Sequence, residues 1–191
     1  MTDSGDLEHA RRGDAGAFGA LARAHERALY GHVARIVGPG ADAEDIVQDA
    51  FISAWRSMGR FEGTSFKAWL FRIGRNRAID VVRARKRKGE VPLEPPDDGQ
   101  GVGWAEPAAG GPELADIASG HEARLAVEQA LAGIPVEQRD ALLLRDVQGF
   151  SYEEIAVITA SEIGTVKSRI HRARLAARNA LIARGWRGSA G

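Results

Sequence analysis

The stretch SYEEIAVITASEIGTVKSRIHRAR, residues 151–174, decides the fold. It predicts a short helix that begins after Ser151, with Glu154 three residues on at the capping-box position. A break near residues 159–161 follows, and a second helix is expected from about residue 162 to 183. A short helix, a tight turn and a second helix with small, polar and basic outward side chains are typical of a DNA-binding helix-turn-helix.

The second helix has two distinct faces. Apolar residues spaced three and four apart mark its inner face: Val166, Ile170, Ala173 and Ala177. On the outer face, Gly164 and Ser168 are small enough for the backbone to approach base edges, and the flanking Lys and Arg side chains suit phosphates and guanine. Small helical hairpins can carry the same pattern, so the pattern alone favours DNA binding without proving it.

The segments on either side of this motif are also expected to be helical. Upstream, one helix is predicted over about 121–132 and another, rich in leucine, after Ile134-Pro135. Before them, residues 89–119 hold seven acidic and no basic side chains, and five of the seven prolines. This segment has no helical or strand period. It therefore predicts a flexible acidic linker between domains 1–88 and 120–191.

The N-terminal domain predicts three longer helices. Apolar spacing predicts one from about Phe18 to Val37 and one over about 42–58. Ser65 is a suitable N-cap for a third helix over about 66–87. That helix is apolar on two faces, so it is buried on both sides or kinked at Gly74. The expected fold class is all-α, with two small helical domains.

Composition narrows the possible functions. The 191 residues contain 26 basic and 26 acidic side chains, yet residues 67–88 hold nine basic and one acidic, and 167–187 hold seven basic and none acidic. Two basic patches suggest two contacts with a polyanion, although solvated helix faces look similar. With no cysteine and no ligand spacing among the five histidines, no metal or other cofactor is expected. The polar N-terminus and the lack of a long apolar run favour the cytoplasm.

Two further patterns are open to two interpretations. Asp45, Asp49, Ile52 and Arg56 share the outer face of the helix over 42–58, which is either a protein-docking face or a plain solvated one. In the helix over 66–87, aromatic side chains are interleaved with arginines. This suits stacking on single-stranded nucleic acid, but for Trp69 and Phe71 taken singly the pattern favours a place in the core.

At this point the sequence resembles a known family. ADAEDIVQDAF (41–51) looks like the core-polymerase-binding signature of extracytoplasmic-function (ECF) RNA polymerase sigma factors, group 4 of the primary sigma factor family. SFKAWLFRI (65–73) and RNRAID (75–80) resemble the promoter-melting part of region 2 in that family. LLLRD (142–146), SYEEIA (151–156) and GTVKSRIHRAR (164–174) resemble its region 4.

The resemblance implies a transcription initiation factor, not an enzyme, that directs core RNA polymerase to promoters, usually under control of an anti-sigma protein. It implies core-polymerase contacts at Asp42, Glu44, Asp45, Gln48, Asp49, Ile52 and Arg56. It implies −10 element contacts, with a base flipped into a pocket, at Arg60, Phe61, Thr64, Ser65, Lys67, Trp69, Arg72, Arg75, Asn76, Arg77 and Arg83. It implies −35 element contacts at Ser151, Gly164, Thr165, Lys167, Ser168, Arg169, His171, Arg172 and Arg174. The linker would thread into polymerase, where its acidic residues would mimic nucleic acid.

Two positions depart from the family pattern. Thr159-Ala160 stands where Leu-Gly is usual, so we expect a different turn or backbone strain at Ala160. Glu162 stands where Pro or Ser is usual, which suits the helix dipole but not a nearby phosphate. Fine −35 specificity is therefore the property most affected.

Two other functions remain open on the residues alone. One is a stand-alone helix-turn-helix regulator, which would need no docking face at 42–56. The other is a DNA-acting enzyme such as a nuclease, which would need acids clustered to hold metal. Opening several base-pair steps costs on the order of 10 kcal/mol, whereas one flipped base returns only a few. A small neutral protein is therefore expected to open DNA only together with polymerase.

Overall fold

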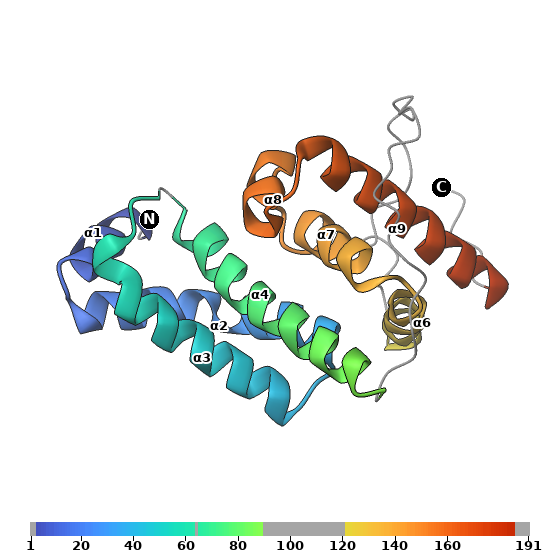
Figure 1. Ribbon diagram of the computed structural model, residues 1–191, viewed down its shortest axis with the longest axis horizontal. Coiled ribbons are helices and arrows are strands. Elements are labelled where there is room, and N and C mark those ends of the chain that lie inside the picture. The colour runs from blue at the N-terminus through green and yellow to red at the C-terminus, as the bar shows by residue number, and fades with distance from the viewer. Residues whose placement is uncertain (1–2, 64, 90–120, 186–191) are drawn as a thin grey trace. The chain divides into compact units, whose positions relative to one another are not determined.

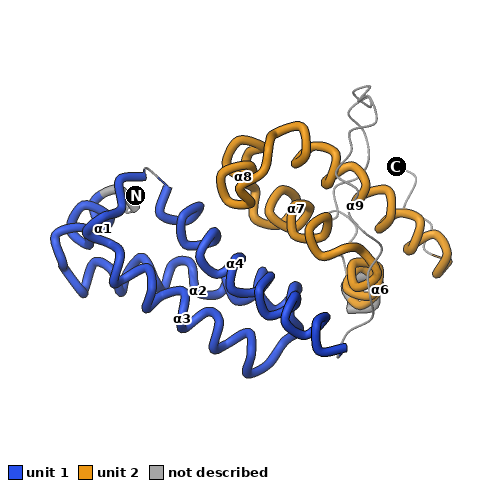
Figure 2. Tube along the Cα trace, in the orientation of Figure 1, with its two compact units in different colours: residues 1–92 blue, residues 93–191 orange. Residues whose placement is uncertain are grey.

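The computed structural model describes residues 3–63, 65–89 and 121–185, and all regular structure in these residues is helical (Figure 1). The predicted all-α fold class is confirmed. The chain divides into two compact units, Met1–Pro92 and Leu93–Gly191 (Figure 2). The predicted linker at 89–119 lies outside the described residues except for Gly89, as does Thr64 of the predicted −10 set.

Unit 1 is built around three long helices. Its elements are α1 (Asp3–Arg11), α2 (Ala15–Val37), α3 (Ala41–Ser57), the 3-10 turn η1 (Met58–Arg60) and α4 (Phe66–Arg87). Helices α2, α3 and α4 pack against one another in all three pairs, and α1 packs on α2 and η1 (Figure 1). The boundaries follow the predicted helices closely, because the stop and cap signals in the sequence are strong.

Helix α2 begins and ends at residues suited to those positions. The Asp14 carboxylate accepts hydrogen bonds from the N–H groups of Ala17 (3.0 Å) and Gly16 (2.8 Å). These two bonds lower the pKa of Asp14, with Ala17 the larger cause. At the other end the chain leaves the helix at Gly38, whose φ of 96° is in the region that favours glycine.

Helix α4 begins at its predicted cap, where the Ser65 hydroxyl accepts from the N–H of Ala68 at 3.1 Å. Both of its apolar faces are buried, because α2 and α3 cover it from different sides. The helix continues through Gly74, where a Cβ would lie 2.9 Å from Cδ1 of Leu29. Gly74 therefore permits close packing of α4 on α2, and of the two predicted alternatives, burial on both sides is the correct one.

Unit 2 contains α6 (His121–Ala132), α7 (Val136–Asp146), α8 (Tyr152–Thr159) and α9 (Ile163–Ala183). Helix α9 packs against the other three. Its predicted inner face is confirmed, since Val166, Ile170, Ala173 and Ala177 are all buried. The core of this unit also takes in Leu142, Leu143 and Leu144 of α7.

Helix α8 has a regular start and an unusual end, at the Ala160 position that departs from the family pattern. Ser151 and Glu154 form the predicted capping box, with bonds of 3.1 Å and 2.8 Å. Helix α8 then ends at Ala160, which adopts the left-handed conformation at φ 51° and ψ 46°. Among the residues described, Ala160 is the one non-glycine residue with positive φ. The expected backbone strain at this position is therefore present.

Candidate functional site

Helix α3 presents a continuous polar face around two exposed apolar side chains. The outward residues predicted for polymerase are all exposed: Asp42, Glu44, Asp45, Gln48, Asp49, Ile52 and Arg56. Ile52 and Trp55 keep 41% and 38% of their surface accessible. Burying such side chains is favourable only when a partner covers them, so this face has the composition of a docking surface with an apolar centre and an acidic margin.

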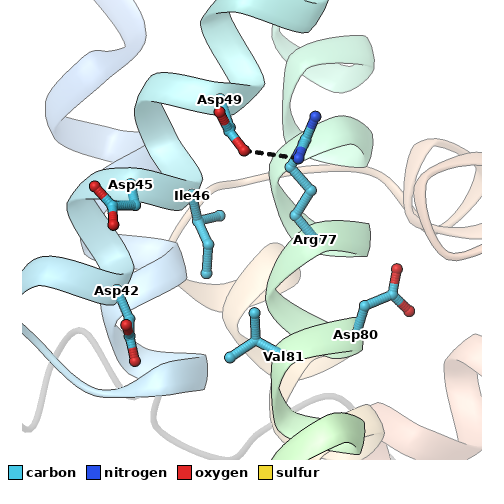
Figure 3. Close-up of a pocket in the computed structure, with 7 residues that line it drawn as sticks. All are labelled: Asp42, Asp45, Ile46, Asp49, Arg77, Asp80 and Val81. Carbon is cyan, nitrogen blue, oxygen red and sulfur yellow. Dashed lines mark hydrogen bonds and ion pairs between the residues drawn. The ribbon is translucent and has the colours of Figure 1, made fainter.

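A hollow lies on each side of this face. One, of about 370 Å³, lies between α3 and α4 and is lined by Asp42, Asp45, Ile46, Asp49, Arg77, Asp80 and Val81 (Figure 3). Its four carboxylates outnumber its one guanidinium, so it is acidic. The other, of about 710 Å³, lies between α2 and α3 and is lined by Arg23, Glu26, Arg27, Tyr30, Glu44, Val47, Gln48, Phe51 and Ile52. Its charges are mixed.

Two arginines of α4 are tied to the acids of α3. Arg77 donates to Oδ2 of Asp49 and to Oγ of Ser53, both at 2.9 Å. Arg85 forms an ion pair with Asp42 and donates to the carbonyl of Val37 at 2.7 Å. The structure therefore brings Arg77, predicted at the −10 element, into contact with Asp49, predicted at polymerase. Sequence reasoning did not identify either pairing.

The start of α4 and the preceding turn form an aromatic cluster. The rings of Phe61 and Trp69 are stacked with centroids 4.5 Å apart, and Phe66 meets Trp69 edge-on at 6.0 Å. Phe18 connects this group to Trp55 of α3, at centroid distances of 6.0 Å from Phe66 and 5.1 Å from Trp55. Phe61 and Trp69, both predicted at the −10 element, are thus stacked on one another, whereas Phe71 is fully buried and belongs to the core.

The remaining residues predicted at the −10 element differ in exposure. Arg60, Arg72, Asn76 and Arg83 are exposed, while Ser65, Lys67 and Arg77 are half-buried. Arg75 is only 7% exposed, and its Nη1 donates to Oδ1 of Asn76 at 3.2 Å. Arg75 therefore belongs to the interior of unit 1, whereas the exposed arginines are accessible to phosphates.

In unit 2, several of the side chains predicted to contact DNA make hydrogen bonds within the helix-turn-helix. Gly164, His171 and Arg174 are exposed, whereas Ser151, Thr165, Lys167, Ser168, Arg169 and Arg172 are half-buried. Ser151 caps α8, and the Ser168 hydroxyl donates to the carbonyl of Thr165 at 2.9 Å. Arg169 donates to Oγ of Ser161 at 3.0 Å and so connects α9 to the turn before it.

Tyr152 at the start of α8 is flanked by two cations. The Arg145 guanidinium lies 4.8 Å from the centre of its ring, and the Lys167 ammonium lies 5.7 Å from it. The pKa of Glu153 is lowered, mainly by its own backbone N–H and then by Ser151, with smaller effects of Lys167 and Arg145. Arg145 is a cation that the predicted set omitted, because the motif spacing alone does not place α7 beside α8.

Arg174 is anchored to the end of α7. Its Nη2 and Nε donate to the two carboxylate oxygens of Asp146 at 2.5 Å and 3.1 Å. The Asp146 side chain is 2% exposed and that of Arg174 is 46% exposed. A bidentate bond to a buried carboxylate is a structural contact, so Arg174 fixes the position of α9 against α7.

Within the described ranges, no helix is long and apolar enough to cross a membrane. The same residues hold no group of three or more histidine or carboxylate side chains arranged for a metal ion.

Comparison with known proteins agrees with this architecture. The family descriptions "Sigma-70 region 2" and "Sigma-70, region 4" match residues 21–88 and 124–176. RNA polymerase sigma-H factor of Pseudomonas aeruginosa is 38% identical over 182 residues, which cover 92% of this chain and 91% of that protein. ECF RNA polymerase sigma-E factor of Escherichia coli K12 is 36% identical over 186 residues, or 94% of each chain.

Solved structures agree as well. Sigma factor RpoE of Bartonella quintana, in complex with the anti-sigma factor NepR, aligns with a TM-score of 0.63 at 31% identity, covering 86% of this chain and 96% of that one. CnrH, in complex with the cytosolic domain of CnrY, aligns with a TM-score of 0.69 at 27% identity, covering 96% and 99%. These matches, over two helical units in this order, place the chain in the ECF sigma factor family, whose members bind core RNA polymerase and direct it to promoters.

Proposed function

We propose that the outward face of α3 is where this sigma factor binds core RNA polymerase. The face consists of Asp42, Glu44, Asp45, Gln48, Asp49, Ile52 and Arg56. The observation that supports it best is the exposed Ile52 within a row of carboxylates, backed by the fully buried Ala43, Ala50 and Ala54. A rigid helix with an apolar centre and acidic margin suits a basic partner surface that has a complementary apolar patch.

The −10 element binds, in this proposal, at the turn over 60–65 and along the exposed side of α4. Exposed cations there are Arg60, Arg72 and Arg83, with Asn76 beside them. A single-stranded segment needs cations for its phosphates and a pocket or platform for its bases. The aromatic cluster at Phe61 and Trp69 provides an apolar wall at the end of α4 where Arg60 and Arg72 also lie.

The −35 element binds at the N-terminal half of α9. Gly164 and His171 are exposed, and Lys167, Ser168, Arg169 and Arg172 lie along the same segment. This is the part of a recognition helix that enters the major groove. Arg145 and Tyr152 lie next to Lys167 and extend the basic surface toward the neighbouring phosphates. Arg174 acts mainly through its bond to Asp146, and so holds the helix in place.

The proposed setting is the cytoplasm, where RNA polymerase works, and the proposed regulator is an anti-sigma protein. The proposal of an anti-sigma regulator is supported by the Bartonella quintana relative, whose structure was solved with an anti-sigma factor bound. Affinity for free duplex DNA is expected to be weak, because the protein has no net charge and does not open base pairs alone.

The test is assembly with core polymerase, followed by run-off transcription from genomic fragments. We expect co-elution, new salt-sensitive start sites and, from those sites, the −10 and −35 sequences. The double variant Asp45→Arg with Ile52→Ala should weaken assembly by about 100-fold, since it reverses a charge and removes an apolar anchor. Asp45 is a better choice than Asp49 because reversing Asp49 would also place two cations together at Arg77.

The control is Gln129→Arg, which adds a positive charge at an exposed position of α6 in the other unit. It should assemble like the wild type. Normal assembly of the double variant would show that α3 is not the docking face. Tight, sequence-selective binding to duplex DNA without polymerase would instead favour a stand-alone regulator.

A further inference from the structure

Arg11 at the end of α1 holds the turn that leads into α4. Its Nη2 donates to the carbonyl of Gly63 at 2.5 Å, across 52 positions of sequence. Its guanidinium also lies over the ring of Phe61, 5.2 Å from the centroid. Glu8, one turn earlier on α1, accepts from Nη1 at 2.7 Å and orients the side chain. One arginine therefore contacts both a backbone carbonyl and a side chain of the same short turn.

The described part of this turn, residues 60–63, packs closely around the ring of Phe61. A Cβ on Gly63 would lie 2.6 Å from Cε2 of Phe61, so the ring packs directly under the Gly63 backbone. Trp69 stacks on the same ring at 4.5 Å. The ring of Phe61 is thus enclosed by Arg11, Gly63 and Trp69. This arrangement makes Phe61 part of a wall and leaves it poorly placed as a free platform for a base.

Helix α1 is seated so that Arg11 can do this. It packs on α2 and on η1, and the backbone carbonyl of Arg11 lies 3.9 Å from where a Cβ of Gly59 would be. The Arg11 side chain is 26% exposed, so its contacts are only partly screened by water. This helix precedes residues 21–88, the segment that the region 2 family description matches.

We propose that Arg11 is a positioning residue for −10 recognition: it fixes the backbone at Gly63 and the ring of Phe61, so that the turn is preformed for an unpaired promoter base. The inference rests on the proposed function of the turn as the −10 reading surface. A preformed turn binds its base without first being ordered, and it accepts one base shape better than others. Arginine suits this role because its planar fork can donate to a carbonyl while it lies over a ring.

The test uses full-length protein assembled with core polymerase. The probe is a fluorescent single-stranded non-template oligonucleotide that carries the −10 sequence found from mapped start sites, together with its single-base variants. The proteins are wild type, Arg11→Ala, Arg11→Lys and the control Arg12→Ala, which removes the same charge from the neighbouring exposed position. Two quantities are measured for each: the affinity for core polymerase and the ratio of affinities between the preferred base and the others.

We expect Arg11→Ala to lose about tenfold in affinity for the preferred oligonucleotide, the loss expected for one charge-assisted hydrogen bond, and to lose most of its preference among bases. Arg11→Lys should recover part of the affinity, since an ammonium can still donate to Gly63, but less of the preference. Core polymerase affinity should stay within about twofold of wild type in both, because unit 1 keeps its fold.

Three results would overturn the proposal: an unchanged base preference in Arg11→Ala, an equal loss in Arg12→Ala, or core-polymerase affinity falling in step with DNA affinity in both Arg11 variants. The last result would indicate a general role in folding. If wild-type holoenzyme itself showed no base preference on the oligonucleotide, the assigned −10 surface would be wrong and the role of Arg11 would be rejected with it.

Discussion

The guanidinium of Arg77 lies 2.9 Å from a carboxylate oxygen of Asp49, and so connects helix α4 to helix α3 at the point where the two proposed surfaces of unit 1 meet (Figure 3). The two side chains are 42% and 57% exposed. Water therefore screens this ion pair, so the pair orients the two side chains more than it stabilises the fold. Arg77 presents Asp49 to the polymerase side while its own charge is partly neutralised.

We predict that this pair contributes little to folding. In a double-mutant cycle of Arg77→Gln and Asp49→Asn, the coupling free energy from urea unfolding should be about 0.5 kcal/mol and should shrink at high salt. With Trp104 and Trp186 changed to phenylalanine, tryptophan fluorescence follows unit 1 through Trp55 and Trp69. A salt-independent coupling above about 2 kcal/mol would mean that the pair is effectively buried.

The bond between Arg174 and Asp146 should be far more important to its unit. Arg174→Ala leaves a carboxylate that is 2% exposed without its bidentate partner. We expect α7 and α9 to lose about 2 kcal/mol, measured by amide hydrogen exchange on the full-length chain. Arg178→Ala removes an exposed cation one turn further along α9 and should have almost no effect. Equal protection in the two variants would contradict the structural role.

Replacing Ala160 by glycine should stabilise the helix-turn-helix. Alanine at φ 51° carries a steric cost that glycine lacks, of roughly 1–2 kcal/mol. The greater freedom of glycine in the unfolded chain offsets part of the gain, so we expect about 0.5–1 kcal/mol from hydrogen exchange in α8 and α9. The same substitution inside α8, Ala156→Gly, should destabilise by about 1 kcal/mol. If both glycines destabilised, Ala160 would not be strained.

Gly74→Ala should destabilise unit 1 although it adds a better helix former. The new methyl group would lie 2.9 Å from Cδ1 of Leu29, and overpacking typically costs about 1–3 kcal/mol against a propensity gain of about 1. Shortening Leu29 to Ala should make Gly74→Ala less harmful, so the double variant should be more stable than the sum of the single effects. Fluorescence-detected urea unfolding measures this.

A control for that experiment is Gly19→Ala in α2. The nearest atom to its added methyl group is the flexible end of Arg23, at 3.3 Å, which can move aside. This variant should therefore gain stability from helix propensity alone. A gain of the same size at Gly74 would mean that α2 and α4 pack less closely there than the distance indicates.

Much of the fold follows from local signals in the sequence. Ser65 and Ser151 are strong N-caps, and the observed helices begin at the residues after them. The buried stripe of α9 follows from the spacing of its apolar residues. Ala160 was suspect for a local reason, the absence of the usual glycine, and its φ is indeed positive. Information of this kind lies within a few residues along the chain.

The side-chain partners could not be predicted in this way. Arg11 meets Gly63 across 52 positions, and Arg77 meets Asp49 across 28, so only the packing of helices brings them together. Arg75 looks like its neighbours in sequence but is 7% exposed, because its direction on α4 turns it inward. A run of arginines in the sequence predicts a basic surface. Whether each arginine is available to a phosphate or is bound within the protein depends on the tertiary structure.

The row of aromatic rings in unit 1 also has a spectroscopic consequence. Trp55 lies at one end, on α3 beside the face proposed for polymerase, and Trp69 lies near the other, in the first turn of α4, where its ring stacks on Phe61 of the turn proposed for promoter DNA. With Trp104 and Trp186 changed to phenylalanine, the chain would carry one intrinsic fluorophore at each of the two surfaces. Stopped-flow traces from variants that retain only one of these two indoles would then time the two binding events separately, without any attached dye.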